Sequence, residues 1–253
     1  MELWSYEHKI TLLPAFVAMI GIGLLLRWWL GKKDYWVRMI PVQILTVILL
    51  VLEVGKQGFS FARGYDLYHI PLHFCSLYLF SLPVLSFYRG KHHSAVAAVC
   101  ASITASLCLL IMIYPALIYG AWDINHYFDD YFAFHTVTFH NIVLLIFVLM
   151  VALDLYVPEK KGEWKPCAWF TVGFCLVSAT MAQLLKTNYA NYYQCNIPPL
   201  EAVRQSLQPV LGYGVTQLIY VLIVSALNIG FVLMCYWLYR AVRKVTHLPK
   251  NEK

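Results

Sequence analysis

Long stretches without a charged residue are the feature that most restricts how this chain can fold. If aspartate, glutamate, lysine and arginine are counted as charged, the uncharged stretches are 67–88, 92–122, 131–153, 166–185 and 205–239. A helix needs ~20 apolar residues to cross a hydrocarbon core of ~30 Å. Each stretch is long enough, so the sequence predicts helices that cross a membrane several times.

Two further apolar segments, about 10–30 and 35–55, are flanked or interrupted only by Arg27, Arg38 and Glu53. The composition agrees with a membrane protein, because 60% of the residues are hydrophobic and 13% are charged, against roughly 25% charged in a soluble domain. We predict an all-α polytopic membrane protein, a seven-transmembrane-helix bundle that forms one integral membrane domain over residues 1–253. The expected spans are about 10–30, 35–55, 70–88, 95–119, 134–156, 167–188 and 214–239.

The distribution of lysine and arginine predicts the orientation. With the N-terminus outside and the C-terminus cytoplasmic, 14 basic residues fall inside and 5 outside, as the positive-inside rule requires. The outer five are Lys9, Lys56, Arg63, Lys186 and Arg204. We therefore expect a multi-pass protein of the cell membrane.

The net charge of +6 does not indicate a nucleic-acid partner, because the basic residues lie in short loops between apolar segments. The expected partner is the lipid bilayer. A zinc site is only weakly indicated, since Pro71 separates His69 from His73, the pair with helical ligand spacing. We predict no metal and no cofactor, and the sequence does not indicate an oligomeric state.

Small residues recur at four-residue spacing in the fourth expected span. They form two series, Ala97–Ala101–Ala105 and Ala98–Ser102–Ser106. Such spacing lets helix backbones approach closely, so we expect this span inside the bundle. Pro115 should end or kink it.

Polar residues at membrane depth are costly and mark functional sites. In the expected topology, most of them fall at the outer end of the spans. They come from different spans, which predicts a shared polar pocket. The candidates are His8, Glu53, His69, His73, Cys75, His126, His135, His140, Gln183, Thr187, Asn188 and Asn191.

Cys75 and His73 suggest a nucleophile and a base. If Pro71 opens the third span, His73 lies in its first turn, where a helix N-terminus helps a thiol to ionise. Residues two apart on a helix point about 200° from each other, so Cys75 would need its base from another span. His140 is the candidate at matching depth. The alternative is that Cys75 is a buried core thiol.

His140 and Glu53 each allow two interpretations. A histidine at that depth needs a hydrogen-bond partner, so His140 either joins helices or takes part in catalysis or binding. Glu53 either orients a histidine or pairs with Lys56. Near the end of the sixth span, Gln183, Thr187 and Asn191 fall at i, i+4 and i+8. That stripe would line a cavity or join neighbouring helices.

Short motifs along most of the chain resemble those of a known family. The segment Tyr68–Cys75 is similar to the "LPLHLC" signature of the YwaF-like bacterial integral membrane proteins. Four further elements occur in the family's order: the Ser5-x-x-His8 element, Glu53, His140 and Thr187-Asn188-Tyr189.

That family is similar, at a distance, to a eukaryotic transmembrane acyltransferase that makes polyunsaturated ether phospholipids with a cysteine–histidine pair. There the cysteine directly precedes the histidine that corresponds to His73. Here Leu72 stands at that position and the nearby thiol is Cys75.

Three functions remain open. In the first, the protein is an acyltransferase or hydrolase that acts on membrane lipids at the outer leaflet. Its expected catalytic residues are Cys75, His140, His73 and Glu53, and its expected substrate-binding residues are His8, His135, Gln183, Thr187, Asn188 and Asn191. The second is a transporter or ligand-binding protein that uses the same outward-facing pocket. The third is a structural or regulatory membrane subunit. A retinal protein is excluded, because the last span has no lysine.

Overall fold

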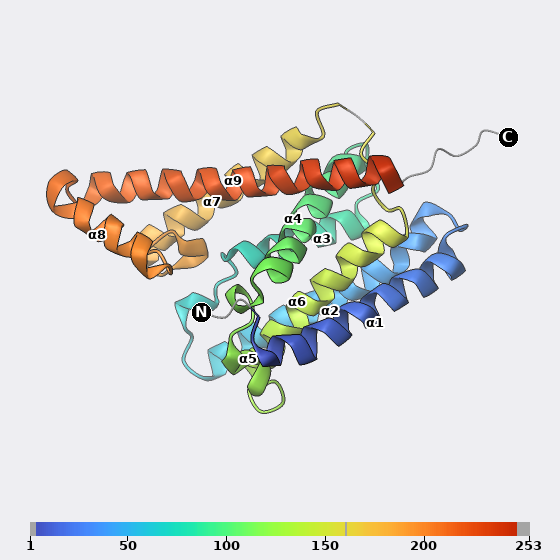
Figure 1. The fold of residues 1–253 in the computed structure, drawn as a ribbon, viewed down its shortest axis with the longest axis horizontal. Coiled ribbons are helices and arrows are strands. Elements are labelled where there is room, and N and C mark those ends of the chain that lie inside the picture. The colour runs from blue at the N-terminus through green and yellow to red at the C-terminus, as the bar shows by residue number, and fades with distance from the viewer. Residues whose placement is uncertain (1–3, 160, 247–253) are drawn as a thin grey trace.

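A computed structural model describes residues 4–159 and 161–246 (Figure 1). The chain is 80% helix, and the described residues contain no strand. The helices are α1 Tyr6–Leu30, α2 Tyr35–Ala62, α3 Leu77–Phe87, α4 His93–Ile113, α5 Ala121–Asn125, α6 Tyr131–Ala152, α7 Trp164–Leu185, α8 Pro198–Leu211 and α9 Tyr213–Thr246. Short 3₁₀ turns lie at η1 Leu67–His69, η2 Phe74–Ser76, η3 Pro115–Leu117 and η4 Tyr189–Asn191.

The predicted all-α polytopic class is confirmed. Within the described residues, six helices are long and apolar enough to cross a membrane: α1, α2, α4, α6, α7 and α9. The third expected span, 70–88, is shorter than predicted, because α3 begins at Leu77 and η2 precedes it. Pro71 does not open this helix. It lies in the segment between η1 and η2.

Helix α4 is the central element of the bundle, as its small residues predicted. It contacts α3, α6, α7 and α9. Ala98, Ala101 and Ser102 are fully buried, since a small side chain is what allows a neighbouring helix to approach on each side. The helix ends at Ile113, and Pro115 starts η3.

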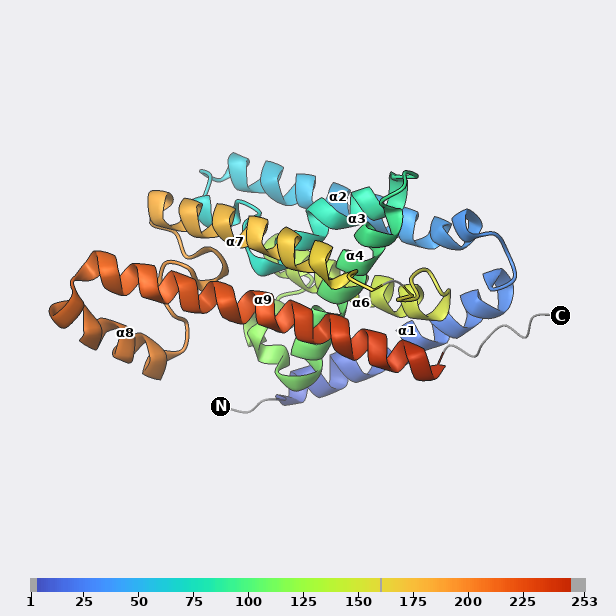
Figure 2. The same cartoon turned by 90° about the horizontal axis from the view of Figure 1, so that it is seen from above.

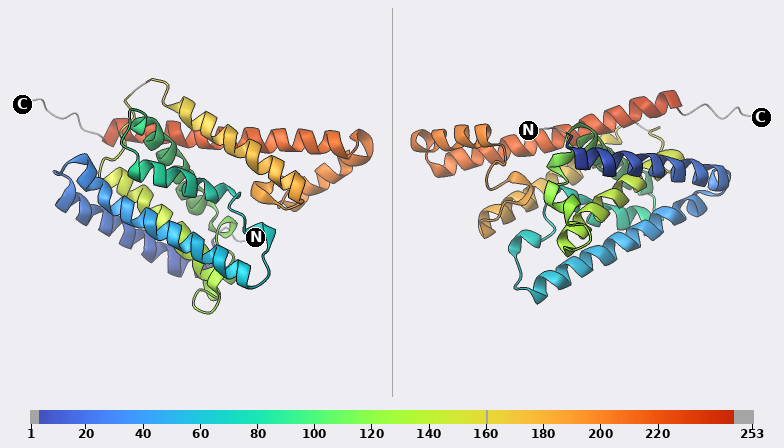
Figure 3. Two further views of the ribbon diagram at one scale, coloured as in Figure 1. Left: turned by 180° about the vertical axis from the view of Figure 1, so that it is seen from behind. Right: turned by 60° about the horizontal axis from the view of Figure 1, so that its bottom comes forward.

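Helix α6 packs against α1 and α2 on the other side of the bundle, where the three helices run side by side (Figure 3). Many large apolar side chains of α1 are exposed, among them Val17, Leu24 and Leu25. An apolar surface of this kind is expected where a helix faces lipid.

Helix α8 was not expected from the sequence. It joins α7 to α9, packs against α9 and has no buried residue. Gly212, with φ +76°, reverses the chain at its end, a conformation that favours glycine. Figures 1 and 2 show α8 and the start of α9 extending beyond the other helices, with the chain turning back between them.

Candidate functional site

A cavity of about 730 Å³ lies near the end of the bundle where α2 ends and α6 begins. It is called the polar cavity below for the polar side chains that form part of its otherwise apolar lining. Its walls come from α2, the segment that includes η1 and η2, α3, α4, η3, α6, the segment after α7, and α9. The predicted site residues that line it are Glu53, His69, His73, Cys75, His135, His140, Asn188 and Asn191. His8, Gln183 and Thr187 are not among its lining residues, and neither is His126.

Glu53 is the central charged group of one wall. Its Oε1 atom lies 2.8 Å from the ammonium of Lys56 and accepts a 2.7 Å hydrogen bond from Gln57. The Gln57 amide also donates to the carbonyl of His69, at 2.7 Å. Because one turn of α2 binds both the carboxylate and the η1 backbone, it holds the segment before α3 against the cavity.

His135 lies on the other side of Glu53. Its Nε2 atom is 3.3 Å from Oε2 of Glu53, which is ion-pair distance, but no hydrogen bond is aligned with that nitrogen in the described part of the chain. The imidazole stacks on Phe139. Glu53 therefore lies within ion-pair distance of both a histidine and Lys56.

His69 borders the cavity from η1, outside the membrane-spanning helices. Its Nδ1 atom lies 2.6 Å from the hydroxyl of Ser60, and its ring stacks on Phe132. Burial lowers the pKa of this imidazole below its ordinary value, which favours its neutral form.

Cys75 and His73 line the same cavity, contrary to the expectation that they would diverge. His73 is the residue before η2, and its backbone is extended, with ψ 159°. The 100° step of an α-helix therefore does not separate the two side chains. The Nε2 atom of His73 lies 2.9 Å from the carbonyl oxygen of Tyr68. Because that oxygen can only accept, Nε2 carries the proton and Nδ1 is the basic nitrogen.

In His140 the basic ring nitrogen is Nε2, whereas in His73 it is Nδ1. Its Nδ1 atom lies 2.7 Å from the carbonyl oxygen of Thr136, one turn earlier on α6. A carbonyl cannot donate, so Nδ1 is protonated and Nε2 has the lone pair. The ring packs edge-on against Tyr119. His140 is thus a buried imidazole with a fixed tautomer.

Amide side chains form the opposite wall. Asn188 and Asn196 hydrogen-bond to each other at 3.0 Å, and Asn228 reaches the hydroxyl of Tyr192 from α9. The Oδ1 atom of Asn191 is buried and has no hydrogen-bond partner in the described residues. An unpartnered buried acceptor is costly, which makes this atom a candidate contact for a bound ligand.

The prediction that Gln183, Thr187 and Asn191 form a polar stripe on one helix is wrong. Helix α7 ends at Leu185, and Lys186, Ala190 and Asn191 have positive φ, so the chain turns instead of continuing as a helix. Gln183 donates to the carbonyl of Tyr192, at 2.8 Å, and supports that turn.

Two further predicted binding residues make local contacts away from the cavity. Thr187 bonds to the carbonyl of Leu185. His8 belongs to a capping box, in which its Nδ1 atom accepts from the backbone N–H of Ser5, at 3.1 Å. Its Nε2 atom lies 3.0 Å from the carbonyl oxygen of Tyr119. The Ser5-x-x-His8 element therefore starts α1 and fastens it to the segment after η3.

Sequence reasoning missed Asn196 and Asn228, and it left Lys56 as a surface residue. Asn228 lies within an uncharged stretch of the last span, and a polar residue at that depth could have identified it. Asn196 had no such signal, because it enters the cavity only through the turns after α7. In the described part of the chain, no group of three or more histidine, cysteine, aspartate or glutamate residues is arranged to hold a metal ion.

The fold and the site together define a polytopic helical membrane protein with a polar cavity near one end of its bundle. A model of the TMEM164 family matches residues 3–239. The chain therefore belongs to the TMEM164 family. No curated protein and no solved structure matches it. The family fits the expected relation to a eukaryotic ether-lipid acyltransferase, whereas the likeness to YwaF-like proteins stays a prediction.

Proposed function

We propose that the protein is an enzyme that transfers or hydrolyses acyl groups of membrane lipids, with Cys75 as nucleophile and His140 as base. The observation that carries this proposal is that both residues line one cavity. The fixed tautomer of His140, which makes Nε2 the basic nitrogen, supports it. A nucleophile paired with an oriented base is the arrangement that acyl transfer needs.

The apolar part of the cavity suits a lipid chain. Leu107 and Leu110 of α4 and Phe231 of α9 line it. Leu117 and Leu227 also line it and are 54% and 67% exposed. We infer that the cavity opens sideways, between η3 and α9, so that a lipid can enter from the bilayer. The ester would lie at the polar end and the chain along the leucines.

The reaction would proceed in two balanced steps. Nε2 of His140 takes the thiol proton as Sγ of Cys75 attacks the ester carbonyl. The carbon–oxygen bond of the ester then breaks, the alkoxide of the lysolipid takes the proton from the imidazolium, and a thioester remains. In the second step a hydroxyl acceptor or water gives its proton to Nε2 and attacks the thioester carbonyl. The carbon–sulfur bond then breaks, and the departing thiolate of Cys75 takes the proton back from the imidazolium.

The other lining residues have supporting roles in this proposal. Glu53 orients His135, and His73, whose Nδ1 atom is basic, is the second candidate for the base. Asn191 would bind the polar part of the substrate, since its buried Oδ1 atom has no partner in the described residues and gains most from a ligand hydrogen bond. Asn188 would do so from the same wall, beside Asn196. By the predicted orientation, this chemistry occurs at the outer leaflet of the cell membrane.

Lipid mass spectrometry tests the proposal. Membranes that contain wild type, Cys75→Ala or His140→Ala at matched protein levels should differ in acyl composition. Removing a general base lowers a rate by roughly 10²–10⁴-fold, so either variant should abolish the change that wild type produces. Cys195→Ala and His126→Ala are matched controls, because neither side chain is among the cavity's lining residues, and both should retain the wild-type lipid profile.

The same experiment separates the competing functions. If wild type and all variants give one acyl profile, the acyl-transfer proposal is wrong for those lipids. A transporter would instead lose solute uptake when Asn188 or Asn191 is changed to alanine. A structural subunit would lose abundance and alter neither lipid nor solute.

A further inference from the structure

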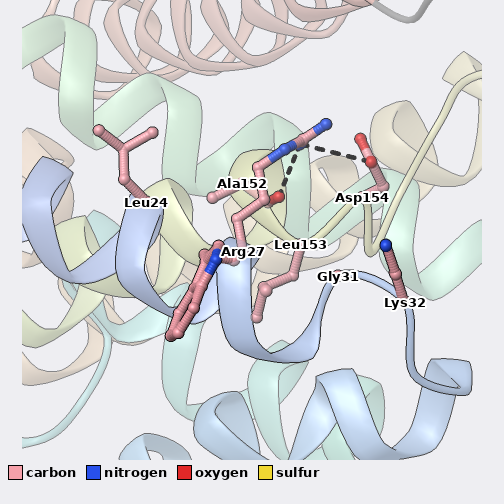
Figure 4. Close-up of a pocket in the computed structure, with 8 residues that line it drawn as sticks. Leu24, Arg27, Gly31, Lys32, Ala152, Leu153 and Asp154 are labelled. Carbon is pink, nitrogen blue, oxygen red and sulfur yellow. Dashed lines mark hydrogen bonds and ion pairs between the residues drawn. The ribbon is translucent and has the colours of Figure 1, made fainter.

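A second cavity, of about 430 Å³, lies at the opposite end of the bundle, where α1 ends beside the end of α6. Figure 4 shows the guanidinium of Arg27 directed toward Asp154 and the carbonyl of Ala152, with Lys32 at the rim. One water occupies roughly 30 Å³ in the liquid, so this cavity has room for a phosphate ester with part of its glycerol.

The charge of this cavity is positive. Arg27 donates through Nη1 to the carbonyl of Ala152, at 2.8 Å, and lies 3.5 Å from Asp154. Asp154 is the single carboxylate among the lining residues, and it is paired with Arg243, whose side chain is 4% exposed. Because Asp154 is already neutralised, Arg27 and Lys32 leave an excess of positive charge. The Arg27 side chain is 53% exposed, so a ligand can reach it.

The surroundings of the cavity are those of a membrane interface. Trp28 and Leu24 line it, and both are exposed on the surface of α1. Tryptophan is enriched at headgroup level, and Leu24 lies one turn deeper along α1, where acyl chains begin. A cation pair at headgroup level, above an apolar side chain, matches a lipid phosphate with its chains.

We propose that this cavity binds the headgroup of an anionic glycerophospholipid, with its phosphate between Arg27 and Lys32. Juxtamembrane basic residues attract the anionic lipids of the cytoplasmic leaflet, and the positive-inside distribution predicts that α1 ends on that side. A lipid seated there bridges α1 and the end of α6. This site lies at the far end of the bundle from the acyl-transfer cavity and does not depend on that activity.

The test is a titration of the purified protein with phosphatidylglycerol in a neutral detergent, with the thermal unfolding midpoint as readout. Phosphatidylglycerol should raise the midpoint of the wild type, and phosphatidylcholine should not. Lys32→Gln and Arg27→Gln should each weaken the apparent affinity for phosphatidylglycerol by about fivefold, the contribution of one basic residue near the membrane. Lys9→Gln, at the other end of α1, is the matched control and should behave as wild type.

Two results would overturn the proposal. One is an equal response to phosphatidylglycerol in wild type, Lys32→Gln and Lys9→Gln, since Lys32→Gln removes charge from the cavity but leaves the Arg27–Ala152 hydrogen bond in place. The other is an equal response to inorganic phosphate alone, which would show that the site binds free phosphate and does not require a lipid.

Discussion

At the scale of single residues, Glu53 organises one wall of the polar cavity. Its carboxylate contacts Lys56 and Gln57 from its own helix and His135 from α6. Glu53 is only 8% exposed, so water screens these contacts little. The pair with Lys56 and the approach to a histidine, which looked like alternatives in the sequence, belong to one cluster.

The first prediction concerns the pair of Glu53 and Lys56. Glu53→Gln and Lys56→Gln should each lower the free energy of unfolding by roughly 1–3 kcal/mol, because each leaves a charged partner unsatisfied in a poorly hydrated place. The double variant should lose less than the sum, by a coupling of roughly 0.5–3 kcal/mol. Denaturant unfolding of all four proteins in detergent measures this cycle, and strict additivity would contradict the contact.

His8 shows how a residue can match a family motif and still have a structural role. Its two ring nitrogens bond to the backbone of Ser5 and of Tyr119, which leaves neither nitrogen for a ligand. The second prediction is that His8→Ala lowers the free energy of unfolding by about 1–2 kcal/mol, through loss of the capping box and of one buried hydrogen bond.

Denaturant unfolding checks the His8 prediction, with the exposed neighbour Lys9→Ala as control. If both variants lose the same stability, the capping interaction is not what matters. Lipid composition in membranes with His8→Ala should equal that of wild type at matched protein levels, because His8 is not among the residues that line the polar cavity.

At the scale of elements, the packing of α4 against its neighbouring helices depends on small side-chain volumes. Ala101 is fully buried, whereas Ala105, on the same series, is half-buried. The third prediction is that Ala101→Leu lowers the thermal unfolding midpoint much more than Ala105→Leu, since overpacking a tight helix contact costs about 1–3 kcal/mol or more. Equal effects at the two positions would mean that α4 is not closely packed at Ala101.

Helix α8 is attached to α9 by a charged cluster. Arg204 bonds to Glu201 and, at 2.7 Å, to Gln217 of α9. Glu201 also accepts from the backbone N–H of Cys195, at 2.9 Å. Hydrogen bonding from Arg204 lowers the pKa of Glu201 from 4.5 to about 2.

The fourth prediction is the pH dependence of this attachment. Because the pKa of Glu201 is lower in the folded protein, its contribution is present above about pH 4.5 and disappears as the pH falls toward about 2. Limited digestion with pepsin should cut α8 of Glu201→Gln faster than α8 of wild type near pH 4.5, and at the same rate near pH 2. A rate ratio that does not change with pH would exclude this role for Glu201.

At the scale of the whole molecule, arginines from three helices meet at the end of α6. Arg27 of α1 bonds to the carbonyl of Ala152, Arg38 of α2 to that of Leu153, and Arg243 of α9 to that of Val151 and to Asp154. The last carbonyls of a helix have no intrahelical partner, and cations are favourable there. This cluster therefore ties the first and last helices of the chain to α6.

The fifth prediction follows from the burial of Arg243. Arg243→Leu should lower the free energy of unfolding by roughly 1–3 kcal/mol, because it removes a 4% exposed donor from Asp154 and from the carbonyl of Val151 at the end of α6. Lys244→Leu, at the exposed neighbouring position, should change the stability little. Thermal unfolding in detergent compares the two variants, and similar midpoints would contradict the proposed fastening of α9.

Much of the candidate site was predictable, since polar residues at membrane depth are few and therefore informative. Glu53, Cys75, His135 and His140 were all identified from their depth in the expected spans, and all line one cavity. His8, Gln183 and Thr187 were chosen from their place at the outer ends of the expected spans and bond elsewhere, because that place does not say which way a side chain points or where a helix stops.

The sequence by itself determined the helical membrane class and the interior place of α4. Both follow from local properties, because the length of an apolar segment decides whether a helix can cross a bilayer and the spacing of small residues decides whether helices can pack closely. Only the tertiary structure decided what forms the cavity. The backbone at His73 is extended, so that His73 and Cys75 both line the cavity, and the turns after α7 carry Asn191 and Asn196 into the opposite wall. These outcomes depend on contacts between segments far apart in the chain, and no local pattern encodes such contacts.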